Sequence, residues 1–147
     1  MNILILGDVM GPSGVKAIRE KLPDLIEQKK IDFVIVNGEN AGDRGVGITK
    51  EIFNEFIKAG ADVVTTGNHV WDEMEAMDLI SKDQRLLRPA NLIKGSPGNG
   101  MGIYKSKNKK KVAVLNLMGN VFMKKCENVF SEAEKFIKKV KLKNYAD

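Results

Sequence analysis

Short apolar runs alternate with longer amphipathic stretches along the first half of the chain. Three runs rich in Ile, Val and Leu cover residues 2–6, 32–36 and 62–66. Between them, apolar residues recur every three or four positions over 13–29 and 49–59, as in helices that bury one face. This strand–helix–strand order predicts a mainly parallel sheet covered by helices, and hence an α/β fold.

Local signals set the expected limits of the helices. The first helix follows a Gly-Pro-Ser turn and contains Pro23, which we expect to perturb it. Thr49 is a suitable N-cap for the second helix, and Gly60 is a suitable residue to end it. After the third strand, a shorter helix is expected over the apolar positions Met74, Met77 and Ile80.

The pattern changes in the second half of the chain. Residues 88–91 are expected to be extended, and the runs 100–105 and 111–117 are separated by a short polar segment, which predicts an antiparallel hairpin. A last amphipathic helix is expected over 131–141. Because no repeat or long linker divides the sequence, we expect one domain, residues 1–147.

Composition narrows the class of protein. Hydrophobic residues make up 43% of the chain, enough to enclose a core. No apolar stretch approaches the ~20 residues that a transmembrane helix needs, so we expect a cytoplasmic protein with no membrane partner. The single cysteine, Cys126, excludes an intrachain disulfide.

The net charge of +5 raises the question of nucleic-acid binding. Most of the excess comes from lysines after Tyr104, and the chain has few arginines for bidentate contacts with bases or phosphates. Solvated lysine-rich helix faces explain this pattern better, so nucleic acid is not the expected partner. A weaker alternative is RNA binding through the lysine-rich end, which would be sensitive to salt.

Each of the three apolar runs ends in a short polar motif. The motifs are Gly7-Asp8, Asn37-Gly38-Glu39-Asn40 and Gly67-Asn68-His69. Because ligands bind beyond the carboxyl ends of parallel strands, we expect the motifs to converge. The carboxylates of Asp8 and Glu39 and the amide oxygens of Asn40 and Asn68 suit hard divalent ions such as magnesium or manganese. His69 can then act as a general acid beside the metal.

Each of these residues could instead have a simpler structural role. Asp8 could form an Asx turn or cap the next helix, and Glu39 and Asn40 could solvate a turn. His69 could be a hydrogen-bonded structural histidine, while Trp71 and the methionines are expected in the core or in a pocket wall. The occurrence of metal-competent groups at three separate strand ends favours a metal site. The glycine spacings of dinucleotide and P-loop sites are absent.

Longer versions of these motifs follow one another in a specific order. They are Gly7-Asp8-Val9-Met10-Gly11, Asn37-Gly38-Glu39-Asn40-Ala41-Gly42, the glycine-rich residues 45–47, Thr65-Thr66-Gly67-Asn68-His69-Val70-Trp71-Asp72, Arg88-Pro89-Ala90-Asn91 and Asn116-Leu117-Met118-Gly119. Together they resemble the YmdB-like metallophosphoesterases, a family of the calcineurin-like superfamily. The resemblance spans essentially the whole chain.

The resemblance implies a fold, an activity and a set of site residues. The fold would be an αββα sandwich, and the activity would be that of a phosphodiesterase, a hydrolase acting on 2′,3′-cyclic nucleotides or related small phosphodiesters. Two divalent or trivalent metal ions, of manganese, iron, magnesium or zinc, would form a dinuclear centre. Asp8 would bind the first metal with help from Asn40, Glu39 would bridge both, and Asn68 would bind the second. His69 would be the proton donor.

The chain departs from the family in one respect. Family members continue into Asp-x-His-Ala-Glu and Gly-x-His-x-His segments that supply histidine ligands, whereas His69 is the only histidine here. We therefore expect the N-terminal portion of the sandwich, truncated before the last strands, with an exposed apolar sheet face that favours a homo-oligomer. The missing histidines could belong to a longer product or to another polypeptide. Alternatively, the chain could be a catalytically incomplete α/β module that binds a phosphate or nucleotide.

Overall fold

The computed structural model describes residues 1–123, 126–140 and 145–147. Its main sheet has four parallel strands side by side in chain order: β1 (Ile3–Leu6), β2 (Phe33–Asn37), β3 (Val63–Thr65) and β4 (Leu86–Leu87). Three helices connect them: α1 (Gly11–Lys29), α2 (Lys50–Ala59) and α3 (Met74–Lys82). The predicted α/β class with a parallel sheet is confirmed.

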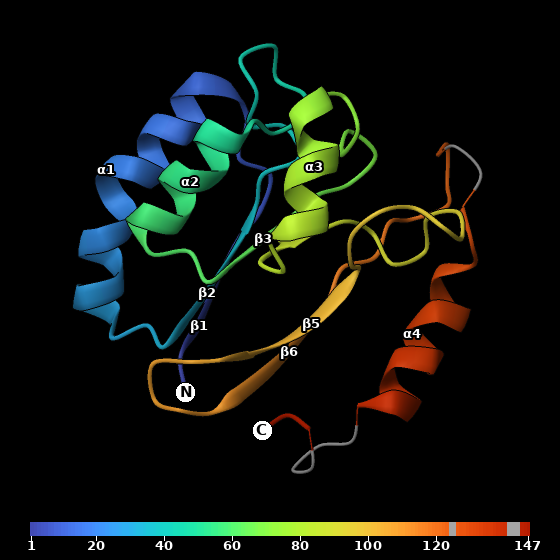
Figure 1. The fold of residues 1–147 in the computed structure, drawn as a ribbon. Coiled ribbons are helices and arrows are strands. Elements are labelled where there is room, and N and C mark those ends of the chain that lie inside the picture. The colour runs from blue at the N-terminus through green and yellow to red at the C-terminus, as the bar shows by residue number, and fades with distance from the viewer. Residues whose placement is uncertain (124–125, 141–144) are drawn as a thin grey trace.

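The larger hydrophobic core lies between this sheet and its helices, which share one face of it (Figure 1). One face of β2 and β3 contributes side chains with no exposed area, including Val34, Val36 and Val64. The helices contribute Leu22 of α1 and Phe53 and Phe56 of α2, at the spacing that the sequence pattern predicted. Burial of these apolar faces fixes the helices over the sheet. The polar motifs lie outside this core, at the carboxyl ends of the strands.

A second layer covers part of the opposite face of the sheet. Strands β5 (Met101–Lys105) and β6 (Lys111–Leu115) form an antiparallel hairpin. Its residues Val112 and Val114 pack with Phe33, Val63 and Leu87 of the main sheet. Helix α4 (Val129–Lys139) lies on the far side of the hairpin, so the layers follow the order helix, sheet, sheet, helix (Figure 1).

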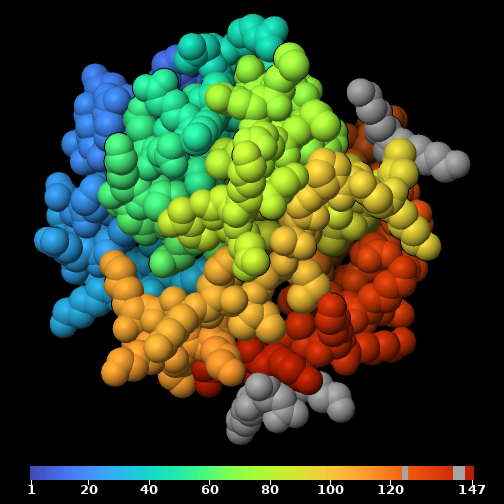
Figure 2. Space-filling view, viewed as in Figure 1, coloured from blue at the N-terminus to red at the C-terminus, as the bar shows by residue number. Residues whose placement is uncertain are grey.

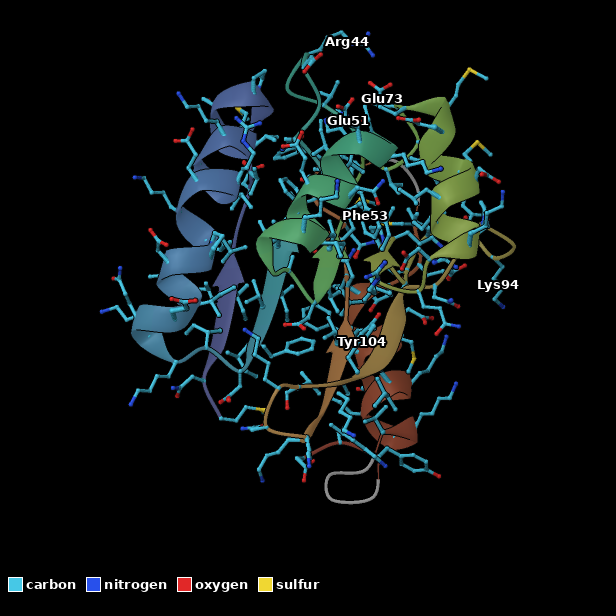
Figure 3. All side chains as sticks on the ribbon, turned by 60° about the vertical axis from the view of Figure 1, so that its left-hand side comes forward. Arg44, Glu51, Phe53, Glu73, Lys94 and Tyr104 are labelled. Atoms are coloured by element: carbon cyan, nitrogen blue, oxygen red, sulfur yellow. The ribbon has the colours of Figure 1, made fainter. Side chains whose placement is uncertain are left out.

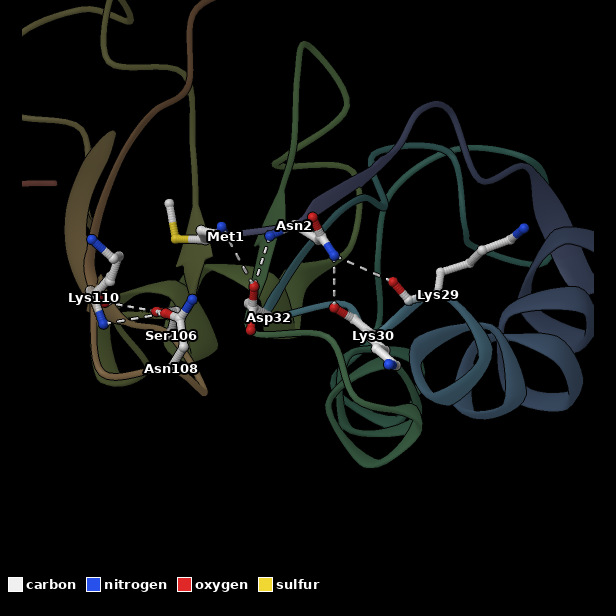
Figure 4. A network of polar contacts seen from close by, with 8 residues as sticks. All are labelled: Met1, Asn2, Lys29, Lys30, Asp32, Ser106, Asn108 and Lys110. Carbon is white, nitrogen blue, oxygen red and sulfur yellow. Dashed lines mark hydrogen bonds and ion pairs between the residues drawn. The ribbon is translucent and has the colours of Figure 1, made fainter.

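Polar contacts fix the chain at the amino ends of β1 and β2, opposite the strand ends that carry the motifs. The backbone N–H of Asn2 donates to Oδ2 of Asp32 over 2.7 Å, and the side chain of Asn2 donates to the carbonyl of Lys30 over 3.1 Å (Figure 4). In the hairpin turn, the hydroxyl of Ser106 donates to the carbonyl of Lys110 over 2.9 Å. These bonds join the start of the chain to the α1–β2 connection and close the turn between β5 and β6.

Several local predictions are confirmed. The side chain of Thr49 accepts a hydrogen bond from Ile52 N–H over 3.2 Å, as an N-cap does. Gly60 ends α2 with φ +109°, in the left-handed region that favours glycine. The expected effect of Pro23 is limited, since α1 contains this residue and continues unbroken to Lys29. Pro23 lies on the exposed face of the helix, away from the core.

Other local predictions are wrong. The stretch 88–91 was expected to be extended, but none of it is a strand and residues 90 and 91 lie in a turn. Strand β4 lies just before it, and its two residues are too few to give a periodic pattern. Met74 and Met77 are 90% and 51% exposed, so they belong to neither core nor pocket wall. They occupy the outer face of α3, whereas Leu79 and Ile80 face inward. Of the last predicted helix, residue 141 lies outside the described residues.

Strand β1 carries the exposed apolar surface that was expected from the sequence. It is an edge strand, and its residues Ile3 and Ile5 are 41% and 69% exposed. In the space-filling view, α2 and α3 cover the upper part of the face shown, above the orange hairpin and the red C-terminal segment (Figure 2). None of the helices in the described ranges is long and apolar enough to cross a bilayer.

Candidate functional site

Backbone hydrogen bonds hold the three strand-end loops together. The loop after β1 donates twice to the loop after β2, from Val9 to the carbonyl of Asn37 over 3.0 Å and from Gly11 to the carbonyl of Asn40 over 2.8 Å. The loop after β2 in turn donates from Gly38 to the carbonyl at the end of β3 over 2.9 Å. The relative positions of the motifs are thus set by main-chain contacts and do not depend on the side chains that would perform the chemistry.

Asp8 and Asn40 meet across the first two strand ends. Nδ2 of Asn40 donates to Oδ1 of Asp8 over 2.6 Å. Asp8 has φ +46°, a left-handed conformation that aspartate tolerates better than most residues and that often occurs at functional sites. Helix α1 begins at Gly11 with Met10 as its N-cap and without a capping side chain, so Asp8 is not a helix cap.

Glu39 lies between the first and third strand ends. Its carboxylate lies so close to the Cα of Gly67 that a Cβ added there would be 1.3 Å from Oε2. Burial raises the pKa of Glu39, the negative charge of Asp8 raises it further, and the nearby His69 acts in the opposite direction. The carboxylate therefore lies within electrostatic reach of both neighbouring motifs.

His69 and Asn68 occupy the turn that follows β3. Asn68 is exposed, and His69 is bonded through Nδ1 to Oδ2 of Asp72 over 2.6 Å. Because an ionised carboxylate can only accept, Nδ1 carries the proton of this bond and Nε2 is left to face other groups. The geometry fixes the orientation of the ring, as is expected for an imidazole that exchanges a proton at Nε2.

The donor atoms of this cluster fit a hard metal ion. Asp8 and Glu39 offer carboxylate oxygens, and Asn40 and Asn68 offer amide oxygens. Burial and then the charge of Asp8 raise the pKa of Glu39, and a cation would relieve the repulsion between the two carboxylates. In the described ranges, no three His, Cys, Asp or Glu side chains lie close enough to hold an ion by themselves. The amides, or groups beyond these residues, would have to complete the coordination.

Two residues of the site were not assigned a role from the sequence. Asp72 belongs to the third motif, and its spacing of three residues from His69 in a turn could have indicated the contact. Gly67 provides the space that the carboxylate of Glu39 occupies, since any larger side chain would overlap it. No sequence pattern gives this second role, because it depends on a contact between residues on neighbouring strands.

A further asparagine and an ion pair hold the region around the third strand end. Nδ2 of Asn116 donates to the carbonyls of Thr66 and Leu87 over 2.8 and 3.0 Å. Arg44, just before the glycine-rich residues 45–47, forms an ion pair of 3.6 Å with Glu73, and both lie at the same end of the molecule (Figure 3). These contacts hold Thr66 and Glu73, which lie before and after the turn that carries the histidine.

Comparison with known protein families shows where the chain belongs. A family model described as YmdB-like protein matches residues 4–146. The chain belongs to the YmdB-like family. The match includes all three strand-end motifs and the hairpin, so the family resemblance seen in the motifs is confirmed.

Known relatives of this YmdB-like chain include proteins named for phosphoester chemistry. It is 42% identical over 137 residues to the 2′,3′-cyclic-nucleotide 2′-phosphodiesterase of Bacillus subtilis strain 168, covering 93% of this chain and 51% of that protein. Among solved structures, a novel phosphatase from Mycoplasma pneumoniae superposes with a TM-score of 0.85 at 30% identity, covering 95% of this chain and 51% of that one.

A second solved structure supports the fold. A protein of Thermus thermophilus described as hypothetical superposes with a TM-score of 0.88 at 33% identity, covering 96% of this chain and 54% of that one. The YmdB-like chain thus spans about half the length of the relatives that it matches. Its fold is that of the corresponding half of these proteins.

Proposed function

We propose that this chain takes part in the metal-dependent hydrolysis of phosphodiesters, with 2′,3′-cyclic nucleotides or related small phosphodiesters as substrates. The observation that supports the proposal is the meeting of Asp8, Asn40, Glu39 and His69 at one edge of the sheet, with Asn68 next to His69 in the same turn. The activity named for the Bacillus relative supports the same chemistry.

Two divalent or trivalent ions, of manganese, iron, magnesium or zinc, are the proposed cofactors. Asp8 and Asn40 would hold the first ion, Asn68 would hold the second, and Glu39 would bridge the two. Bound ions would supply positive charge to the phosphate oxygens and lower the pKa of water. The oxygen donors of these four side chains support this assignment.

His69 is the proposed proton donor. When water attacks phosphorus, a new P–O bond forms, the bond to the departing ribose oxygen breaks, and that oxygen takes up a proton. With Nδ1–H bonded to Asp72, that proton would come from Nε2 of the imidazolium form of His69, and the proton that the attacking water gives up would restore this form. Asp72 would act as a positioning residue, since it touches the ring and holds it in one orientation.

Hydrolysis assays on two substrates test the proposal. With manganese added, we expect the chain to hydrolyse 2′,3′-cyclic AMP and bis(p-nitrophenyl) phosphate, and Asp8→Asn to lose both activities. His69→Ala should slow the hydrolysis of the cyclic nucleotide by about 10²–10⁴-fold. It should slow the hydrolysis of the nitrophenyl ester less, because nitrophenolate departs without a proton. Met74→Ala, at a 90% exposed position on α3, is the matched control and should leave both rates unchanged.

The second candidate function is an α/β module that binds a phosphate or nucleotide without hydrolysing it. It is favoured by one observation: the described residues hold no cluster of three His, Cys, Asp or Glu side chains. A folded chain that binds cyclic AMP but hydrolyses neither substrate with any of the four metals would support this candidate and refute the first. Metal content measured after dialysis separates the two in the same preparation.

A further inference from the structure

A small cavity lies beside the candidate metal ligands. It has a volume of about 190 Å³, and its walls include Asn68, Trp71 and Asp72 from the turn after β3 and Leu92 and Ile93 from the segment after β4. Asn68 therefore belongs both to the candidate metal site and to the rim of the cavity. A ligand bound at the metal site could place its next chemical group in the cavity.

The wall formed by residues 89–97 is held in place before any ligand binds. The guanidinium of Arg88 donates to the carbonyls of Pro89 and Pro97 over 2.8 and 3.0 Å. The hydroxyl of Ser96 donates to the carbonyl of Ile93 over 2.7 Å. These bonds close the segment on itself, so that binding would require little ordering of the wall.

The remaining wall is held by a fully buried asparagine. Nδ2 of Asn91 donates to the carbonyl of Met118 over 2.7 Å, and Met118 N–H donates back to Oδ1 of Asn91 over 2.9 Å. Met118 is only 8% exposed and lines the cavity. Strand-end segments from the main sheet and from the hairpin thus join at this cavity through a reciprocal pair of hydrogen bonds.

The cavity has the chemistry of a site for a flat aromatic group. Its walls are mainly apolar, and Trp71 provides an indole that is half-buried. The volume is below the ~300–1,000 Å³ of pockets that enclose a whole drug-sized ligand, so it suits one ring system. Any of the nucleobases can stack on an aromatic side chain.

We propose that this cavity binds the nucleobase of the phosphodiester substrate, while the phosphate lies at the cluster around Asn68. This inference rests on the proposed function, because it names the part of that substrate which the cavity recognises. The ribose would span the short distance between the two sites, which share one residue. Phosphodiesters without a base would then bind less tightly than cyclic nucleotides.

Tryptophan fluorescence tests the proposal without metal or catalysis. Trp71 is the only tryptophan and lines the cavity, so all of the tryptophan emission comes from a residue of its wall. In metal-free protein with EDTA, adenosine should quench this emission saturably, whereas ribose should not. Ile93→Ser, which removes part of the apolar wall, should raise the dissociation constant of adenosine about tenfold. Ile137→Ser on α4 is the matched control, since Ile93 and Ile137 are 65% and 67% exposed, and it should leave the constant unchanged.

The outcomes separate this proposal from the proposed function. Absence of saturable quenching, equal quenching by ribose, or equal effects of the two isoleucine substitutions would overturn the nucleobase site, whatever the hydrolytic activity. Saturable quenching weakened only by Ile93→Ser would support it. If that quenching occurs in a chain that hydrolyses nothing, the phosphodiesterase proposal fails and the nucleobase site stands.

Discussion

Replacing Gly67 by alanine should remove Glu39 from the site while leaving the fold intact. The Cβ of an alanine at this position would lie 1.3 Å from Oε2 and 2.5 Å from Cδ of Glu39. Ordinary van der Waals contact begins at 3.4 Å, so the carboxylate must move by about 2 Å. Gly67 has no positive φ, so the substitution adds no backbone strain, and the group that moves is the end of a flexible side chain.

A displacement of this size decides whether Glu39 can bind metal. Ligand distances in metal sites hold within about 0.2 Å, so a carboxylate moved by about 2 Å is no longer a ligand. Loss of even an outer hydrogen-bond partner of a ligand typically weakens metal affinity about 10–100-fold. We therefore expect Gly67→Ala to lower manganese affinity by at least that factor, with a thermal unfolding temperature close to that of the unchanged chain.

Calorimetric titration with manganese measures the effect. Gly7→Ala is the matched control: Gly7 lies at another strand end of the same site, and a Cβ there would meet nothing within 4 Å. The double variant Gly67→Ala/Glu39→Ala should bind manganese no more weakly than Glu39→Ala alone, because both substitutions remove the same ligand, the carboxylate of Glu39. Equal manganese affinity for Gly67→Ala and Gly7→Ala would refute the reasoning, as would additive losses in the double variant.

Three further predictions concern other parts of the molecule. Because His69 is the only histidine, ¹⁵N NMR should show that the neutral form of its imidazole is protonated at Nδ1, and Asp72→Ala should shift this form toward the Nε2–H tautomer; an unchanged tautomer would contradict the positioning role. Burial raises the pKa of Tyr104 to about 12, and its hydroxyl donates to a backbone carbonyl over 2.6 Å, so Tyr104→Phe should cost about 1 kcal/mol. The fold favours the neutral phenol, so the difference in the free energy of unfolding between the two proteins should be present below pH 10 and vanish as the pH approaches 12. Urea unfolding measures this difference, and a value that stays constant with pH would count against the prediction. Light scattering should detect self-association that Ile5→Lys reduces and Met74→Lys does not, and a monomer at high concentration would contradict the prediction.

The layout of the main sheet could be predicted because it follows from local periodicity. Strands β1, β2 and β3 are apolar runs, and α1 and α2 have apolar faces at helical spacing, so the sequence pattern of each element agrees with its final environment. Strand β4 could not be predicted, because Leu86 and Leu87 form a strand only through pairing with β3. The exposure of Met74 and Met77 could not be predicted from residue type, because it depends on which face α3 turns to its neighbours.

Some features of the candidate site could likewise be predicted from the sequence, and others could not. The convergence of the three motifs could be predicted, since the carboxyl ends of neighbouring parallel strands must lie at one edge. The contact of His69 with Asp72 and the packing of Glu39 against Gly67 depend on the loop conformations that follow the strands. Those conformations are set by main-chain hydrogen bonds between loops far apart in sequence, which no periodicity reports.

The balance between carboxylates and amides at this edge has a consequence for substrate binding. Asp8 and Glu39 already repel each other enough to contribute to the raised pKa of Glu39, and carboxylates in place of Asn40 and Asn68 would add to that repulsion. With amides at those two positions, the cluster carries less negative charge than a pair of divalent ions would carry positive charge. The excess positive charge would face the open side of the strand ends, where an anionic phosphodiester would bind. In the proposed site, the amides would thus complete the coordination of metal without cancelling the charge that would attract the substrate.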